Sequence, residues 1–162
     1  MKLVMVSEEE FTIYLKDVDV QALDFSDRAQ LERYFKKIFL NLKNHYQMPL
    51  RGFYDIRFFV DPQNGGVIEA TKEIEEFFQV FDEKVDMKIT CTLDCTFFYQ
   101  ITDYFMLDAI NRDDFDIYYY EGLFYLKPKH ELDLKTRFYL SEFATICYGD
   151  KQDDVVLHGK KL

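Results

Sequence analysis

The stretch from Asp116 to Leu126, DIYYYEGLFYL, constrains the fold of this chain more than any other feature. Its tyrosine, isoleucine, phenylalanine and leucine residues form two runs, and only Glu121-Gly122 interrupts them. A two-residue break that ends in glycine, between runs rich in strand-forming residues, predicts a β-hairpin. Neither strand carries a histidine, serine, cysteine or paired acid. We therefore expect this segment to form sheet and surface, and not a catalytic centre.

The composition indicates a globular protein. The chain has 162 residues, of which 48% are hydrophobic and 18% are aromatic, all of them Tyr or Phe. This length fits one domain of ordinary size or two small ones. An odd count of three cysteines, with no signal peptide before the strand-like MKLVMV, predicts a reducing, cytoplasmic setting. No run approaches the roughly 20 apolar residues of a membrane span.

The charge argues against nucleic acid as a partner. The formal net charge is −10, whereas binding to phosphate needs clustered Lys and Arg. The densest negative charge lies in residues 73–86, EIEEFFQVFDEKVD, which contain six acidic residues and one lysine. We interpret this segment as an acidic linker. A short helix docked by its phenylalanines and a mimic of a partner-binding motif are the alternatives.

Residues 1–72 predict a first domain with the order ββαββ. A strand pair, Lys2–Val6 and Phe11–Leu15, precedes a connection and then a helix from Asp27 to about Tyr46, whose apolar residues recur every three or four positions. The turn signal 61–66 separates the strands 53–60 and 67–71.

The solvent side of that first helix is basic. It carries Arg28, Arg33, Lys36, Lys37 and Lys43. One interpretation is a patch for an acidic partner. The other is an ordinary solvated helix face, because every amphipathic helix needs a charged side.

Residues 87–162 predict a second domain with the order βαββαβ. Its elements are one or two strands within 88–100, a short helix over 102–111, the 116–126 hairpin, a helix over 133–147 and a final strand over 154–157. This order allows both helices to lie on one face of the sheet. The fold class we expect is therefore α+β, with two small two-layer α/β sandwich domains.

Candidate chemical motifs are weak. Cys91 and Cys95 have no second ligand pair for zinc, and two half-buried thiols facing the same side of one strand explain them better. The acidic run 113–116 lacks the full loop of a calcium site, so a solvated connection is the simpler interpretation. The three histidines are scattered, and no phosphate-binding glycine pattern is present. We expect no catalytic residues, no metal and no cofactor.

Three patterns follow one another in the C-terminal third of the chain. They are Tyr119, Tyr120, Glu121, Gly122, Tyr125 and Leu126 in the hairpin, the triplet Glu142-Phe143-Ala144, and the run Leu157-His158-Gly159-Lys160. In this order they resemble the C-terminal domain of MecA-type adaptor proteins. The first domain is similar in plan to the N-terminal domain of that family, with Asp19 and Leu23-Asp24 before a helix that carries paired aromatics.

The resemblance implies an adaptor that is not itself an enzyme. In that family the N-terminal domain captures a substrate protein, such as a competence regulator, and the C-terminal domain binds the Hsp100 ATPase ClpC, which works with the protease ClpP. The partners implied are thus a ClpC-like ATPase and a substrate such as a transcription regulator, without nucleic acid or membrane. Self-association into a homo-oligomer is an open alternative.

The candidate surfaces follow from this assignment of roles. For the ATPase we select the hairpin and the last helix, namely Tyr118, Tyr120, Glu121, Tyr125 and Glu142, because interfaces favour tyrosine anchors. Alternate strand residues face opposite ways, so some of these tyrosines belong to the core. For substrate capture we select the basic helix face together with Phe53 and Phe59. An enzyme or small-molecule binder on the same fold, or an unrelated interaction domain, is the competing class.

Overall fold

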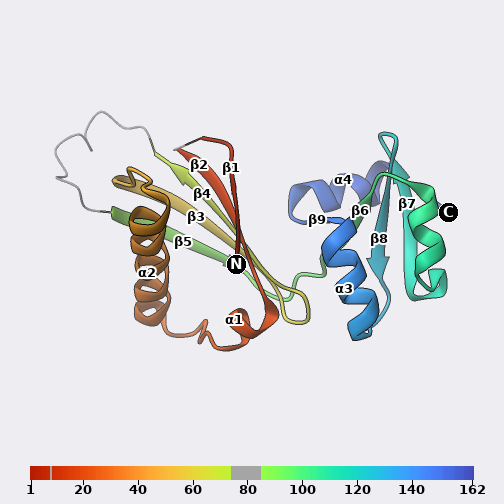
Figure 1. Ribbon diagram of the computed structural model, residues 1–162, viewed down its shortest axis with the longest axis horizontal. Helices are drawn as coiled ribbons and strands as arrows, with labels where there is room; N and C mark the ends of the chain where they lie inside the picture. The colour runs from red at the N-terminus through yellow and green to blue at the C-terminus, as the bar shows by residue number, and fades with distance from the viewer. Residues whose placement is uncertain (8, 74–84) are drawn as a thin grey trace. The chain divides into compact units, whose positions relative to one another are not determined.

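The chain divides into two compact units. A computed structural model describes residues 1–7, 9–73 and 85–162, and it separates Met1–Leu93 from Asp94–Leu162 (Figure 1). Each unit contains helices and one sheet of five strands. The expected α+β fold with two domains is therefore confirmed. Most of the acidic segment, residues 74–84, lies outside the described residues, and so do the interpretations of it as a docked helix or a motif mimic. The prediction that it links the two domains is wrong, because the residues on both sides of it belong to the first unit.

The first unit is a mixed, mainly antiparallel sheet with a helix along one face (Figure 1). Its elements are β1 (Lys2–Met5), β2 (Glu10–Leu15), α1 (Asp17–Gln21), α2 (Arg28–Tyr46), β3 (Gly52–Asp61), β4 (Gly65–Lys72) and β5 (Val85–Thr92). The strand order is β1-β2-β4-β3-β5, and every neighbouring pair except β3–β5 is antiparallel. Both strand pairs that the sequence predicted for this unit are confirmed.

Helix α2 forms because a capped start leads into a regular apolar stripe. The Asp27 carboxylate accepts a hydrogen bond from the Gln30 backbone N–H at 3.0 Å, which satisfies one of the free donors of the first turn. The buried stripe consists of Leu31, Phe35, Ile38, Phe39 and Leu42. Its aromatic rings meet the sheet edge-on, with Phe39 and Tyr54 5.0 Å apart and Phe35 and Phe58 5.5 Å apart.

Strand β5 corrects the predicted domain boundary. We expected the second domain to start at residue 87, but Val85–Thr92 pairs in parallel with β3 over eight residues, from Gly52↔Val85 to Phe59↔Thr92. Met87 is buried in the core of the first unit, with Ile89 and Cys91 packed against it. Cys91 and Cys95 therefore do not share a strand, because β5 ends at Thr92 and Cys95 belongs to the second unit.

The second unit has nine elements, again around one sheet. They are β6 (Phe98–Ile101), the 3-10 helices η2 (Tyr104–Ala109) and η3 (Arg112–Asp114), β7 (Phe115–Tyr120), β8 (Leu123–Pro128), α3 (Leu134–Phe143), β9 (Thr145–Cys147), α4 (Asp150–His158) and β10 (Lys160–Lys161). The strand order is β10-β7-β8-β6-β9.

The hairpin predicted at residues 116–126 is confirmed as β7 and β8. Tyr120 pairs with Leu123, so Glu121 and Gly122 form the turn. Both have positive φ angles, 49° and 81°, as a type I′ turn requires. Glycine suits this position because its missing Cβ removes the steric cost of a left-handed backbone.

Helices cover both faces of this sheet, whereas the sequence predicted helices on one face only. Leu107 of η2 and Leu140 of α3 share a core with Phe115 and Leu126, so the two predicted helical segments do lie on one face. Val155 of α4 packs on the other face against Tyr118 and Tyr125. The prediction of a strand over 154–157 is wrong, because these residues belong to helix α4, in which Val155 is buried while Val156 and Leu157 are exposed. The helix predicted over 133–147 ends at Phe143, and β9 follows it.

Candidate functional site

The hairpin tyrosines divide between core and surface differently from the expectation. Tyr118 and Tyr125 are buried, with 8% and 0% of their surface exposed, and Tyr118 stacks on Phe98 with ring centroids 6.1 Å apart. They therefore cannot anchor a partner, because α4 covers their face of the sheet. Tyr120 is half-buried beside Tyr125, whereas Glu121 at the turn and Glu142 on α3 are exposed.

The opposite face of the hairpin end carries an exposed aromatic patch, which consists of Tyr104, Tyr119 and Phe124, and Phe105 is a further exposed ring next to Tyr104 in η2. The Phe124 ring lies 5.2 Å from that of Tyr119 and 5.4 Å from that of Tyr104. Tyr104, Phe105 and Tyr119 are 44%, 77% and 43% exposed. The sequence interpretation missed this patch, although strict alternation along β7 would have placed Tyr119 opposite Tyr118.

The patch is held in place by an arginine. The Arg112 guanidinium lies 4.9 Å from the centroid of the Tyr104 ring and donates to the Tyr104 hydroxyl at 2.8 Å. A second donation, to the Asp108 carboxylate at 2.5 Å, fixes its orientation. Arginine and tyrosine side chains that are ordered before binding lose little entropy when a partner arrives.

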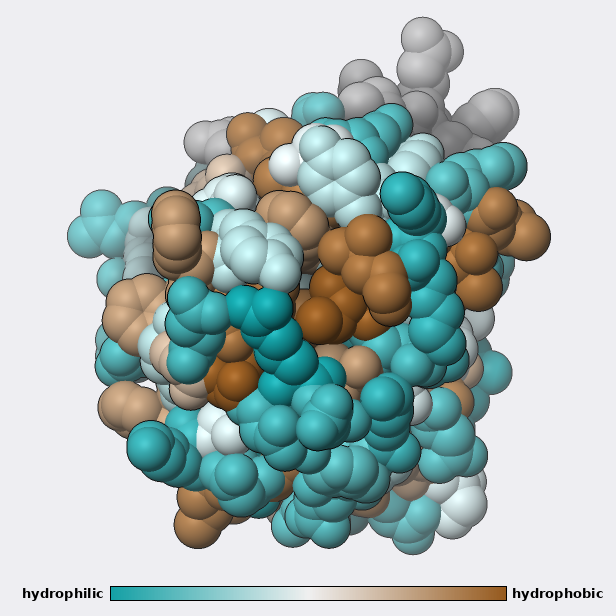
Figure 2. Space-filling model, turned by 90° about the vertical axis from the view of Figure 1, so that its right-hand side faces the viewer, coloured by the Kyte–Doolittle hydropathy of each residue, from teal (hydrophilic) through white to brown (hydrophobic). Residues whose placement is uncertain are grey.

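Helix α3 exposes further apolar side chains. Only Leu140 of this helix is buried, while Leu134, Phe138 and Phe143 are 78%, 67% and 55% exposed. On the face that Figure 2 views, apolar areas lie among hydrophilic ones. Apolar surface of this kind, rimmed by polar residues, is typical of protein-binding sites.

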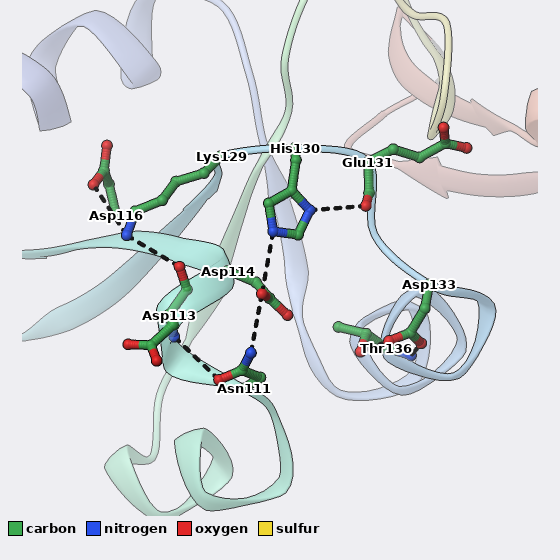
Figure 3. Close-up of polar contacts among 9 residues, drawn as sticks. All are labelled: Asn111, Asp113, Asp114, Asp116, Lys129, His130, Glu131, Asp133 and Thr136. Carbon is green, nitrogen blue, oxygen red and sulfur yellow. Dashed lines mark hydrogen bonds and ion pairs between the residues drawn. The ribbon is translucent and has the colours of Figure 1, made fainter.

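A polar network around His130 joins the segment after β8 to the 3-10 helix η3 (Figure 3). One ring nitrogen lies 3.0 Å from the Glu131 carbonyl oxygen and the other 3.1 Å from the Asp114 carboxylate. Because both partners are acceptors, both ring nitrogens donate only in the protonated form. The bond to Glu131, and after it the bond to Asp114, raises the pKa of His130. Asn111 donates to the same Asp114 carboxylate at 3.0 Å.

Two aspartates of the acidic run 113–116, Asp114 and Asp116, form ion pairs with neighbouring residues. The Asp116 carboxylate lies 3.0 Å from the Lys161 ammonium, and the hydrogen bond to Lys161 lowers the pKa of Asp116. Asp114 points instead to His130, so the carboxylates do not converge (Figure 3). Within residues 1–7, 9–73 and 85–162, no group of three or more His, Cys, Asp or Glu side chains is arranged to hold a metal ion.

The first unit offers a pocket of about 450 Å³ between α1 and α2. Its apolar wall is formed by Val18, Ala22 and Leu23, together with Tyr34. Its polar lining is Asp19, Gln30, Arg33 and Lys37. Two of the predicted basic residues, Arg33 and Lys37, thus line this α1–α2 pocket. The sequence interpretation missed the pocket, because it treated residues 17–27 as a connection, whereas α1 forms one wall of the pocket.

The other predicted substrate residues lie elsewhere. Lys36 and Lys43 are exposed on α2 outside the pocket, and Arg28 is exposed but pairs with Glu32 at 3.3 Å. Phe53 is half-buried, and Phe59 is only 5% exposed beneath the Arg57 guanidinium, which lies 5.1 Å from the centroid of its ring. Phe59 is therefore not an exposed contact residue, which corrects the expectation.

Three comparisons with known proteins found no relative of this chain. Neither the protein-family models, nor the curated proteins, nor the solved structures contain a match. Among the helices of the described residues, none has the length and apolar character that a bilayer crossing requires.

Proposed function

We propose that this protein is an adaptor that captures substrate proteins with its first unit and delivers them to a ClpC-like Hsp100 ATPase with its second. The observation that carries the proposal is the presence of two compact units with separate cores and with surfaces of different chemistry. The first unit presents a cationic pocket, and the second presents exposed aromatic and aliphatic side chains. Two unlike surfaces on one chain suit a protein that holds two partners at once.

The aromatic patch replaces the buried tyrosines as the proposed ATPase contact. Tyr104 and Tyr119 supply exposed rings that pack against Phe124, and Arg112 also contacts Tyr104. Large aromatic residues next to arginine are the composition of binding hot spots. Glu121 and Glu142 remain exposed candidates for charged contacts with the ATPase.

The mechanism is bivalent tethering, and the adaptor itself carries out no chemistry. Once the second unit is bound to the ATPase, a substrate on the first unit is held near the entrance of the unfoldase. The second encounter becomes intramolecular, with an effective concentration of about a millimolar for short linkers. Transfer then depends on geometry and on weak, reversible capture.

The experiment that tests the proposal is a binding and activity assay with purified ClpC. The full chain should bind ClpC in a pull-down and raise its ATPase rate. Absence of both effects at micromolar protein would refute the adaptor role. To separate the units, the chain should be cut after Leu93 and not after Glu83, because the earlier cut removes β5 from the first sheet.

A further inference from the structure

We infer that the α1–α2 pocket binds an acidic peptide segment that inserts one apolar side chain. This inference rests on the proposed adaptor function and defines the class of substrate that the first unit recognises. It is carried by the position of the pocket, by its free positive charges and by its apolar wall.

The α1 wall of the pocket is anchored to the sheet. Val20 is 3% exposed and packs in the core of the first unit. Gly66 of β4 makes this close approach possible, because a Cβ at that position would lie 3.1 Å from the Val20 methyl group. The start of α1 is closed by Asp19, whose carboxylate accepts from the Lys16 backbone N–H at 3.3 Å.

The connection between α1 and α2 is also fixed. The Asp24 carboxylate accepts from the backbone N–H and the hydroxyl of Ser26, at 2.9 and 2.6 Å. The Gln30 side chain accepts from the Asp24 backbone N–H at 2.9 Å. Phe25 packs on Phe58 with ring centroids 5.7 Å apart. Since both walls are held before a ligand arrives, binding does not have to order them.

The cations at the pocket are free to meet a ligand. Arg33 and Lys37 lie four residues apart on α2, so their side chains emerge from the same face. Both are exposed, and neither forms an ion pair with any residue in the described ranges. Two adjacent positive charges without partners are complementary to carboxylates, and the arginine fork can hold one of them with two hydrogen bonds.

The pocket wall adds an apolar requirement. Val18 is 62% exposed there although it is aliphatic, and Ala22, Leu23 and the Tyr34 ring continue the same wall. Burial, and next the negative charge of Asp19, raises the pKa of Tyr34, so its phenol is a neutral hydrogen-bonding group. One apolar side chain between acidic residues would fill the wall while its neighbours reach Arg33 and Lys37.

Polyanions fit this site less well than an acidic peptide. Asp19 contributes a negative charge within the pocket, and the whole chain carries a net charge of −10. A nucleic acid presents a continuous row of phosphates and would meet both repulsions. A peptide with carboxylates only beside its apolar residue avoids Asp19.

The test uses the full chain and a fluorescein-labelled peptide in which a central leucine is flanked by glutamates and serines. We expect saturable binding by fluorescence anisotropy that weakens with added salt. The double variant Arg33→Glu/Lys37→Glu should bind about tenfold more weakly or worse. The matched control is Lys36→Glu/Lys43→Glu, which makes the same charge change on the same helix outside the pocket and should lose less than threefold, about what long-range charge alone accounts for.

A second pair of measurements tests the apolar wall. Replacing the peptide leucine by serine, or making Val18→Asp in the protein, should each weaken binding by about tenfold. Equal losses in the two double variants, an unaffected leucine-to-serine peptide, or equal binding of a single-stranded DNA oligonucleotide would overturn the inference. So would the absence of peptide binding at millimolar concentration.

The outcome is separable from that of the proposed function. A chain that binds and stimulates ClpC but ignores the peptide would refute the pocket inference and leave the adaptor role standing. A chain that binds the peptide at the pocket but does not bind ClpC would refute the adaptor role and leave the pocket inference standing. Circular dichroism of each variant distinguishes lost binding from lost folding, since Arg33, Lys36, Lys37 and Lys43 are all exposed.

Discussion

Tyr119 and Phe124 lie directly opposite each other on β7 and β8, with ring centroids 5.2 Å apart, and Tyr119 remains 43% exposed. Tyr118, its neighbour in sequence, points to the other face and is buried against Phe98. Adjacent tyrosines of one strand therefore have separate roles. One extends an exposed aromatic patch, and the other fills the core beneath α4.

This division can be measured by urea denaturation of two variants. Tyr118→Ala should lower the free energy of unfolding of the second unit by about 3 kcal/mol, because it removes a buried ring. Tyr119→Ser should lower it by less than about 1 kcal/mol, the range of a partly exposed cross-strand pair. Equal losses at the two positions would mean that both tyrosines are core residues.

The close contact at Gly66 gives a prediction for the first unit. A Cβ at this position would lie 2.6 Å from a ring carbon of Phe58 and 3.1 Å from the Val20 methyl group. Gly66→Ala should therefore lower the free energy of unfolding by about 1–3 kcal/mol through overpacking. The control is Gly122→Asn, since a Cβ there meets nothing within 4 Å and asparagine tolerates the positive φ. A smaller loss at Gly66 than at Gly122 would contradict the packing of α1 on β4.

Cys147 should resist alkylation in the folded protein. It is 3% exposed, and burial raises the pKa of its thiol to about 11. At pH 8 this leaves roughly a hundredfold less thiolate than a thiol of ordinary pKa would have. Iodoacetamide labelling followed by mass spectrometry should find Cys147 unmodified in buffer and modified in concentrated urea. Rapid labelling without urea would show that α4 does not cover this face.

The His130 network predicts a pH dependence of stability. The folded-state pKa is raised, so the imidazolium contributes stability that is fully present below its ordinary value of 6.5 and is lost as the pH rises through the folded value. An NMR titration of the ring protons should give a pKa above 6.5, and Asp114→Asn should bring that pKa down. In the His130→Gln variant, the free energy of unfolding measured by urea denaturation should lose this component of its pH dependence. A His130 pKa at or below the ordinary value would rule out the two hydrogen bonds.

Local signals in the sequence were sufficient for the antiparallel part of the fold. Glu121-Gly122 and the turn 61–66 each specify a connection between strands that are neighbours in sequence, and Asp27 marks the start of α2. The parallel strand β5 carries no such signal, because its partner β3 lies more than thirty residues earlier. Only the tertiary contacts of Met87 assign it to the first unit.

The errors in the second unit have a common physical cause. Helices cover both faces of its sheet, so both faces of β7 are aromatic or apolar and alternation cannot tell inside from outside. That is why Tyr118 and Tyr125 were selected for the surface. Residues 154–157 looked strand-like because of their valines, and packing of Val155 on the two tyrosines outweighs that preference.

The most direct test of the adaptor account is the ATPase rate of ClpC with three forms of the full chain. The unaltered chain should raise the rate, and Tyr104→Ser/Tyr119→Ser should lose most of this stimulation while remaining folded, because both side chains are exposed. Arg33→Glu/Lys37→Glu should stimulate as the unaltered chain does, since its changes lie in the other unit. Stimulation that survives loss of the aromatic patch, or no stimulation by any form, would contradict the account.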